Sequence, residues 1–233
     1  MPRSPVEPSV PSGAVVVGSE TPGITGPALD WAADYAEHAG RPLVTLTLAD
    51  SAVELVHASR TAHLLVLGAR GHRMSQSVPA GRMGTWLARR ASCPVVVVPE
   101  RDPGTVRQGV LVGVAATPTA RAVLDFACQY AATHDLPLSV VHTAKGAAGT
   151  ADERRRWLAE SVGGISERFP DVRVNTVLLP SRPIGTLLHM AKRMNLLVVG
   201  QHRPAGGHRS PSGHVRSSIV ERSPCPTAVV PAS

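Results

Sequence analysis

Leu64-Leu65-Val66-Leu67-Gly68 opens the stretch that decides the fold, and Cys93-Pro94-Val95-Val96-Val97-Val98-Pro99 closes it. Each apolar run is short and continuous, which is typical of a strand buried on both faces of a parallel sheet. Between the runs, Gly68, Gly71 and Gly81 follow the spacing G-x2-G-x9-G and precede a predicted helix over 83–90. Glycine tolerates left-handed backbone and lets a ligand approach closely, and free amides at a helix start favour a phosphate. The stretch therefore predicts a strand, a glycine loop able to hold a phosphate group, a helix and a second strand.

The same landmarks return near the C-terminus. Gly68, Gly81, Cys93 and Pro99 recur 132 positions later as Gly200, Gly213, Cys225 and Pro231. Earlier landmarks recur after only 95 positions, since Gly18 and Trp31 match Gly113 and Phe126. We interpret the chain as an internal duplication whose first repeat lacks 37 residues of the second. Those residues hold a predicted helix over 152–168 and a predicted strand over 172–179, so the first repeat should have a narrower sheet.

Hydrophobic periodicity places the remaining elements. Strands are predicted over 14–17, 42–48, 110–113 and 196–200, and helices over 27–39, 51–59 and 121–133. Leu29, Ala32, Ala33 and Ala36 share the predicted buried face of the first helix, and Gly40 stands where a left-handed cap is usual. Alternating strands and helices predict an α/β fold with parallel strands. The predicted organisation is a disordered tail over 1–12, a repeat over 13–100, a polar linker over 101–108 and a second repeat over 109–231.

Composition and charge narrow the class of protein. The 233 residues are 43% hydrophobic and only 3% aromatic, and carry a net charge of +7. Positive charge favours phosphates, but the sequence has no dense basic block interleaved with aromatic residues, so nucleic-acid binding is disfavoured. We find no apolar stretch of membrane-spanning length and no secretory signal. Three cysteines, two of them at equivalent positions, indicate small buried side chains in a reducing compartment. We expect a cytoplasmic protein without a membrane partner.

Both repeats resemble the universal stress protein family, whose signature is G-x2-G-x9-G-(S/T) followed by a helix and a Cys-Pro-Val strand. The first repeat keeps the glycine spacing, with Arg82 in place of the hydroxyl residue. The resemblance implies two adenine-nucleotide-α-hydrolase-like (Rossmann-like) parallel-sheet repeats that form an intramolecular pseudo-dimer. Because the family commonly dimerises through its last strand, Val95–Val98 and Ala228–Val230 should pair across a pseudo-twofold axis.

The resemblance also implies a nucleotide site in the first repeat. The family places an Asp after its first strand, next to the adenosine, and here Ser19 or Glu20 stands at that place. The implied ligand is ATP, with Mg²⁺, and the implied binding residues are Ser19, Glu20, Gly68, Arg70, Gly71, Gly81, Arg82 and Met83. In the second repeat, Arg203, His214 and Ala115 replace the middle glycine, the hydroxyl residue and the Asp, so we expect no useful ATP binding there.

The resulting hypothesis is a non-catalytic stress-response regulator that binds ATP weakly in its first repeat. The bound state would alter contacts with an unknown protein partner, and further homodimerisation of the chain stays open. The alternative is a degenerate interaction scaffold that binds no nucleotide. Slow ATP hydrolysis has little support, because no base or metal site is evident in the sequence.

Other clusters have simpler explanations. His202, His208 and His214 recur every six residues, but no Cys or carboxylate between them offers a fourth zinc ligand. We interpret them as solvated histidines, with binding of a different anion as an alternative. The acidic residues Glu20, Asp30 and Asp34 lie at a predicted loop and helix start, where capping explains them.

Overall fold

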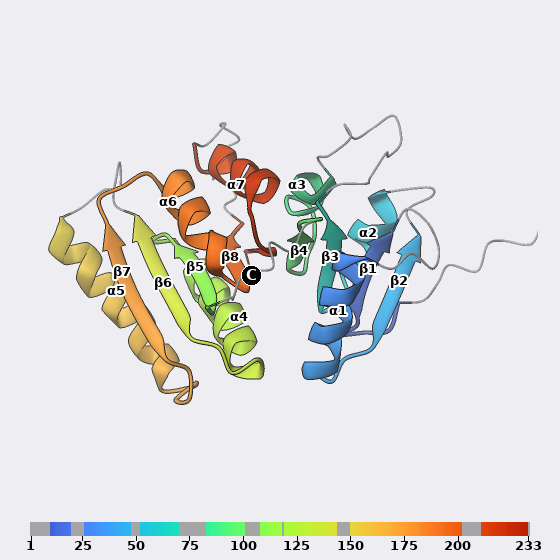
Figure 1. Ribbon diagram of the computed structural model, residues 1–233, viewed down its shortest axis with the longest axis horizontal. Helices are drawn as coiled ribbons and strands as arrows, with labels where there is room; N and C mark the ends of the chain where they lie inside the picture. Colours follow the sequence, from blue (N-terminus) through green and yellow to red (C-terminus); the bar gives the residue numbers. More distant parts are fainter. Residues whose placement is uncertain are drawn as a thin grey trace, which may run out of the picture.

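The computed structural model describes residues 10–19, 26–47, 52–69, 83–100, 108–117, 119–143, 150–201 and 211–232. Within these ranges, nine strands form one sheet (Figure 1). The strands are β1 (Val15–Ser19), β2 (Leu43–Thr47), β3 (Leu64–Gly68), β4 (Val95–Val98), β5 (Val110–Val114), β6 (Leu138–Thr143), β7 (Val174–Leu179), β8 (Leu196–Gly200) and β9 (Thr227–Val230). The α/β class with a mostly parallel sheet is confirmed.

The strand order is β2-β1-β3-β4-β9-β8-β5-β6-β7, and every pair is parallel except β4 and β9. Those two strands run antiparallel, with Val96 opposite Ala228. The pairing expected between 95–98 and 228–230 is therefore present. It divides the sheet into an N-terminal half of four strands, β2-β1-β3-β4, and a C-terminal half of five, β9-β8-β5-β6-β7.

Helices cover both faces of the sheet (Figure 1). They are α1 (Pro27–His38), α2 (Ala52–Ala58), α3 (Met83–Leu87), α4 (Ala120–Thr133), α5 (Ala151–Ser166), α6 (Pro183–Met190), the short 3₁₀ helix η1 (Ala191–Arg193) and α7 (Pro211–Arg222). Side chains of α2, α3, α6 and α7 join one buried core, and those of α1, α4 and α5 join the other. In β3, Leu65 and Leu67 enter the first core whereas Leu64 and Val66 enter the second. This division explains why the strands are continuously apolar rather than alternating.

Some local predictions need correction. On α1, Ala33 is exposed, and the buried residues are Ala32, Tyr35 and Ala36. Helix α3 ends at Leu87, before the predicted end at 90, because the chain tightens and the N–H of Arg90 bonds to the Leu87 carbonyl. The sequence pattern does not predict α6, because the segment is short and polar residues flank it.

The left-handed cap after α1 is confirmed. Gly40 has a φ of 60°, its N–H bonds to the Glu37 carbonyl, and the N–H of Arg41 bonds to the Ala36 carbonyl. The equivalent position after α4 is Asp135, which adopts a φ of 50° with the same pair of hydrogen bonds. A non-glycine residue is therefore held in a conformation that glycine adopts more readily.

The ends of the predicted repeats are described only in part. Residues 1–9 of the expected tail and 101–107 of the expected linker lie outside the described residues. Residues 10–12 are described, and Val10 packs against the first core, which places the start of the packed chain before residue 13.

All three cysteines are buried and free, as expected. In the part of the chain that the structure describes, no helix has the length and apolar character needed to cross a membrane.

Candidate functional site

The carboxyl ends of β1 and β3 bring two of the predicted site residues together. Gly18 lies opposite Leu67 in the parallel register, and the next residues of the two strands are Ser19 and Gly68. Ligands of open parallel sheets bind at this edge. Ser19 and Gly68 therefore lie next to each other at this edge of the sheet.

Met83 is the first residue of α3, on the connection between β3 and β4, and its side chain is buried in the first core. It contributes packing at this edge rather than an exposed contact surface. Five other predicted residues fall outside the described residues, namely Glu20, Arg70, Gly71, Gly81 and Arg82.

The backbone at Gly68 differs from the prediction. Gly68 belongs to β3 and lies opposite Val98, and the N–H of Ala69 bonds to the Val98 carbonyl at 2.7 Å. Gly68 is absent from the described glycines with positive φ, which are Gly13, Gly40 and Gly109. The chain thus stays extended through Gly68, and this glycine does not provide the left-handed turn that its spacing suggested.

The start of α3 lies directly on β4. A β-carbon added at Gly84 would lie 2.6 Å from Val97 Cγ2 and 3.6 Å from Val220 Cγ1 of α7. Gly84 therefore allows α3 to approach both the sheet and α7. The described part of α3 has five residues, from Met83 to Leu87.

The corresponding edge of the C-terminal half is closed by packing. A β-carbon at Gly200 would lie 2.9 Å from Val123 Cγ2 and 3.2 Å from Thr119 Oγ1, both on the α4 side. Gly200 thus permits close helix–sheet packing. The exposed Ala115 follows β5, where it offers no carboxylate. Gly213 lies inside α7, so the predicted glycine loop of this half ends earlier than its spacing suggested.

Gln201, which follows Gly200, was not identified from the sequence. Its side chain is 3% exposed, and its Nε2 donates to the Ala88 carbonyl at 2.9 Å. Its backbone N–H bonds to the Val230 carbonyl. Gln201 therefore uses its side-chain amide to join the end of α3 to the C-terminal half.

His142 is a second residue that sequence reasoning missed. It lies near the end of β6, 4% exposed, with Nδ1 2.9 Å from the Val114 carbonyl and its ring tilted against Trp157 at 5.3 Å. The carbonyl contact indicates that Nδ1 carries the proton. Its Nε2 is buried and has no hydrogen-bond partner among the described residues. This acceptor could have been found only from the fold, because an isolated histidine after an apolar run carries no specific sequence signal.

Comparisons with known proteins agree with this architecture. The sequence model of the universal stress protein family matches residues 107–231, more than half of the chain. The chain is similar to a universal stress protein of Mycolicibacterium smegmatis, with 31% identity over 188 residues that cover 76% of this chain and 64% of that protein. A Mycobacterium tuberculosis universal stress protein is 28% identical over 193 residues, covering 75% of this chain and 61% of the relative. The chain thus matches less than two thirds of the length of these relatives.

Among solved structures, the fold is similar to a universal stress protein from Archaeoglobus fulgidus. The TM-score is 0.64 at 17% sequence identity, and the match covers 94% of this chain and 86% of that chain. The similarity extends across both halves of the sheet and supports the fold.

Proposed function

The chain belongs to the universal stress protein family, and we propose that it is a non-catalytic stress-response regulator that binds an adenine nucleotide in its N-terminal half. The observation that carries the proposal is the position of Ser19 beside Gly68, at the carboxyl ends of two adjacent parallel strands. Gly68, Gly71 and Gly81 also keep the family's glycine spacing. The proposed ligand is ATP with Mg²⁺, bound by the predicted residues around these positions.

We propose that residues 13–100 and 109–231 are two repeats that form an intramolecular pseudo-dimer. The order β2-β1-β3-β4 of the first half corresponds to β6-β5-β8-β9 of the second, and the two orders meet at the antiparallel β4–β9 pair. The second half has additional elements, α5 and β7, in the region that the alignment of repeats leaves unmatched. Both outer strands of a single repeat would otherwise be open edges, and the β4–β9 pair covers one of each.

The C-terminal half is proposed not to bind ATP. Ala115 offers no carboxylate, and the space next to Gly200 is filled by Val123 and Thr119. A lost hydrogen bond to a nucleotide hydroxyl would weaken binding by roughly 1.5–3 kcal/mol if the acceptor is charged. In this proposal, the C-terminal half has a structural role and pairs with the N-terminal half through β4 and β9.

In this proposal, nucleotide binding alters contacts with a partner protein in the cytoplasm. The second candidate is a scaffold that binds no nucleotide. Gln201 favours this second candidate. It follows Gly200 of the glycine motif, and its side chain forms a hydrogen bond that joins the two halves. Both candidates are non-enzymatic, and they differ in whether nucleotide stabilises the fold.

Thermal unfolding of the full chain with and without millimolar Mg-ATP separates the two candidates. A ligand at a hundred times its Kd stabilises by about 2.7 kcal/mol, which for a chain of this length raises Tm by roughly 5–10 °C. The decisive variant is Gly71→Arg, which introduces the residue that the second half carries at the matching position, Arg203. Arg203→Gly is the matched control, since it restores the glycine where no site is proposed.

A Tm rise in the wild type and in Arg203→Gly, lost in a folded Gly71→Arg, supports a nucleotide site in the first half. No rise in the wild type at any ATP concentration would leave the scaffold as the surviving candidate. A rise retained in Gly71→Arg but increased by Arg203→Gly would place binding in the second half instead. Phosphate release measured in the same samples tests the non-catalytic part of the proposal.

A further inference from the structure

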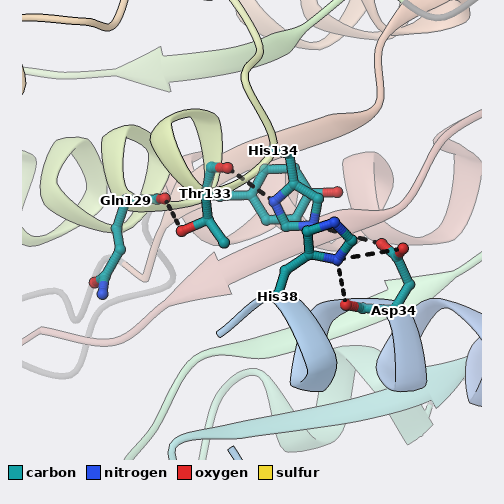
Figure 2. Close-up of polar contacts among 6 residues, drawn as sticks. Asp34, His38, Gln129, Thr133 and His134 are labelled. Atoms are coloured by element: carbon teal, nitrogen blue, oxygen red, sulfur yellow. Dashed lines mark hydrogen bonds and ion pairs between the residues drawn. The ribbon is translucent and has the colours of Figure 1, made fainter. Parts of the chain in front are cut away.

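Three potential metal ligands meet where α1 and α4 end. Asp34 and His38 are one turn apart on α1, and His134 follows the last residue of α4 (Figure 2). One ligand atom from each residue lies within 4.8 Å of the others. His134 Nε2 is 3.4 Å from Asp34 Oδ2, and His38 Nδ1 is 3.5 Å from Asp34 Oδ1. The cluster joins the N-terminal half to the C-terminal half.

His134 is held in a fixed orientation and tautomer. Its Nδ1 lies 2.9 Å from the Tyr130 carbonyl, so Nδ1 carries the proton and donates it. Its ring stacks on Tyr130 with a centroid separation of 4.0 Å. The side chain is only 10% exposed, and Nε2 is buried without a hydrogen-bond partner among the described residues. The Nε2 atom of His134 therefore faces the Asp34 carboxylate.

His134 Nε2 and Asp34 Oδ2 lie close enough to share a cation. A proton would give a charge-assisted hydrogen bond, whose usual length is about 2.7–2.9 Å. The observed 3.4 Å is longer. It is instead close to the separation of about 3.4 Å between two ligands on a tetrahedral Zn²⁺, given metal–ligand bonds of about 2.0–2.1 Å. His38 Nδ1 lies 3.5 Å from the other carboxylate oxygen, Oδ1, so His38 has to turn before the three residues can each present one atom to a common ion.

We propose that Asp34, His38 and His134 bind one late first-row divalent transition-metal ion, represented by Zn²⁺. Two imidazoles and one carboxylate suit Zn²⁺, Ni²⁺ or Cu²⁺ better than Mg²⁺ or Ca²⁺, which prefer oxygen ligands. Three protein ligands leave the fourth position for water. The contact of His134 Nδ1 with a backbone carbonyl is the outer-shell arrangement typical of metal-bound histidine.

Metal entry requires a rotation of His38. Its Nδ1 lies 2.8 Å from the Asp34 backbone carbonyl, and its ring stacks on His134 at 4.7 Å and 23°. The side chains of His38 and Asp34 are 44% and 56% exposed, so the ring can turn and the ion can arrive from solvent. The bound ion would fasten α1 to α4 and raise the stability of the chain.

This site is separate from the proposed nucleotide site. His38 and His134 precede β2 and β6, at the amino-terminal edge of the strands, whereas Ser19 and Gly68 lie at the carboxyl edge. The proposal therefore does not depend on nucleotide binding, and each can fail without the other.

The test is a Zn²⁺ titration of the metal-free full chain in competition with a chromophoric chelator. We expect one ion per chain and an affinity reduced at least about tenfold in Asp34→Asn and in His38→Gln, since even outer-shell changes cost about 10–100-fold. Both side chains are well exposed, so these variants should fold. His134→Phe keeps a ring on Tyr130 while removing the ligand atom. His57→Gln, an exposed helical histidine elsewhere, is the matched control and should bind normally.

Two further measurements identify the source of any binding. Co²⁺ should give the intense visible bands of a tetrahedral site, and these bands should be lost in Asp34→Asn. A triple variant with His202→Gln, His208→Gln and His214→Gln should retain both the bands and the Zn²⁺ affinity. Zn²⁺ binding that is unchanged in Asp34→Asn and His38→Gln, or abolished in the triple variant, would overturn the proposal, as would the absence of Zn²⁺ binding to the wild type.

Discussion

The side-chain amide of Gln201 donates a hydrogen bond to the carbonyl of Ala88, 2.9 Å away, and so connects the end of β8 to the end of α3. The two residues are 113 positions apart and belong to different halves of the sheet. Gln201 is 3% exposed. A buried polar pair of this kind is costly to break, because the remaining group has no water to replace the lost partner.

Replacing Gln201 with Ala should therefore destabilise the chain by about 1–3 kcal/mol through the unpaired Ala88 carbonyl and the lost packing. Urea unfolding measures the change. Gln129→Ala removes an exposed glutamine from α4 and should change stability by less than about 0.5 kcal/mol. Equal effects of the two substitutions would show that the Ala88 contact contributes nothing.

Asp135→Gly should stabilise the chain. Asp135 holds a φ of 50° at the end of α4, where the matching position after α1 is Gly40. Relief of the left-handed conformation should outweigh the greater unfolded-state entropy of glycine by about 0.5–1 kcal/mol.

The reverse change, Gly40→Asp, is the natural control and should lower the urea midpoint by a similar amount. If Asp135→Gly were destabilising, the Asp135 side chain would have to contribute a local interaction larger than the backbone strain.

The strands were predictable from the sequence, and the long-range side-chain contacts were not. Short, continuous apolar runs that end in glycine are typical of strands buried on both faces of a parallel sheet. The chain has two of them, Leu64–Gly68 and Leu196–Gly200. The pairing of β4 with β9 followed from the resemblance to a family that dimerises through this strand. By contrast, Gln201, His142 and His134 gain their chemistry from residues distant in sequence, so no local pattern could identify them.

The predicted nucleotide site shows the same limit. Spacing alone identified Gly68, but it could not show that this residue remains extended and paired with β4. A glycine after a strand is compatible with a turn, a phosphate contact or close packing. Only neighbouring side chains decide between these roles, as Thr119 and Val123 do at Gly200.

Stability should decline at alkaline pH because of Tyr35. Burial raises the pKa of Tyr35 from 10.0 to about 12, with a smaller opposing effect of Arg41. Since the folded pKa lies above the unfolded value, this contribution is fully present below about pH 10 and is lost as the pH rises toward about 12. Urea unfolding from about pH 8 to about pH 11 should show the decline, and Tyr35→Phe should make it shallower. The remaining decline comes from the thiols of Cys93 and Cys128, because burial raises the pKa of each from 9.0 to about 12. Identical profiles would contradict this assignment.

His63 should make the free energy of unfolding depend on pH in the acidic range. Its Nε2 lies 2.8 Å from the Tyr35 hydroxyl, and burial, followed by Arg41, lowers the pKa of His63. The folded pKa lies below the unfolded one, so the contribution is fully present above about pH 6.5 and is lost as the pH falls through the folded value. The difference in unfolding free energy between wild type and His63→Gln, measured over this range, should change with pH. A difference that stays constant over this pH range would contradict the assignment.

Two helical glycines should respond to alanine in opposite directions. At Gly163 of α5 an added β-carbon would meet nothing within 4 Å, so Gly163→Ala should gain helix propensity worth about 1 kcal/mol. At Gly84 of α3 the same atom would lie 2.6 Å from Val97 Cγ2. Val97 is buried and β-branched, and cannot turn aside without disturbing β4. Overpacking of about 1–3 kcal/mol should therefore exceed the propensity gain, so Gly84→Ala should lower the urea midpoint while Gly163→Ala raises it. If both substitutions raised the midpoint, α3 would have to lie farther from β4 than the described packing places it. The position of α3 beside the proposed nucleotide site would then be wrong as well.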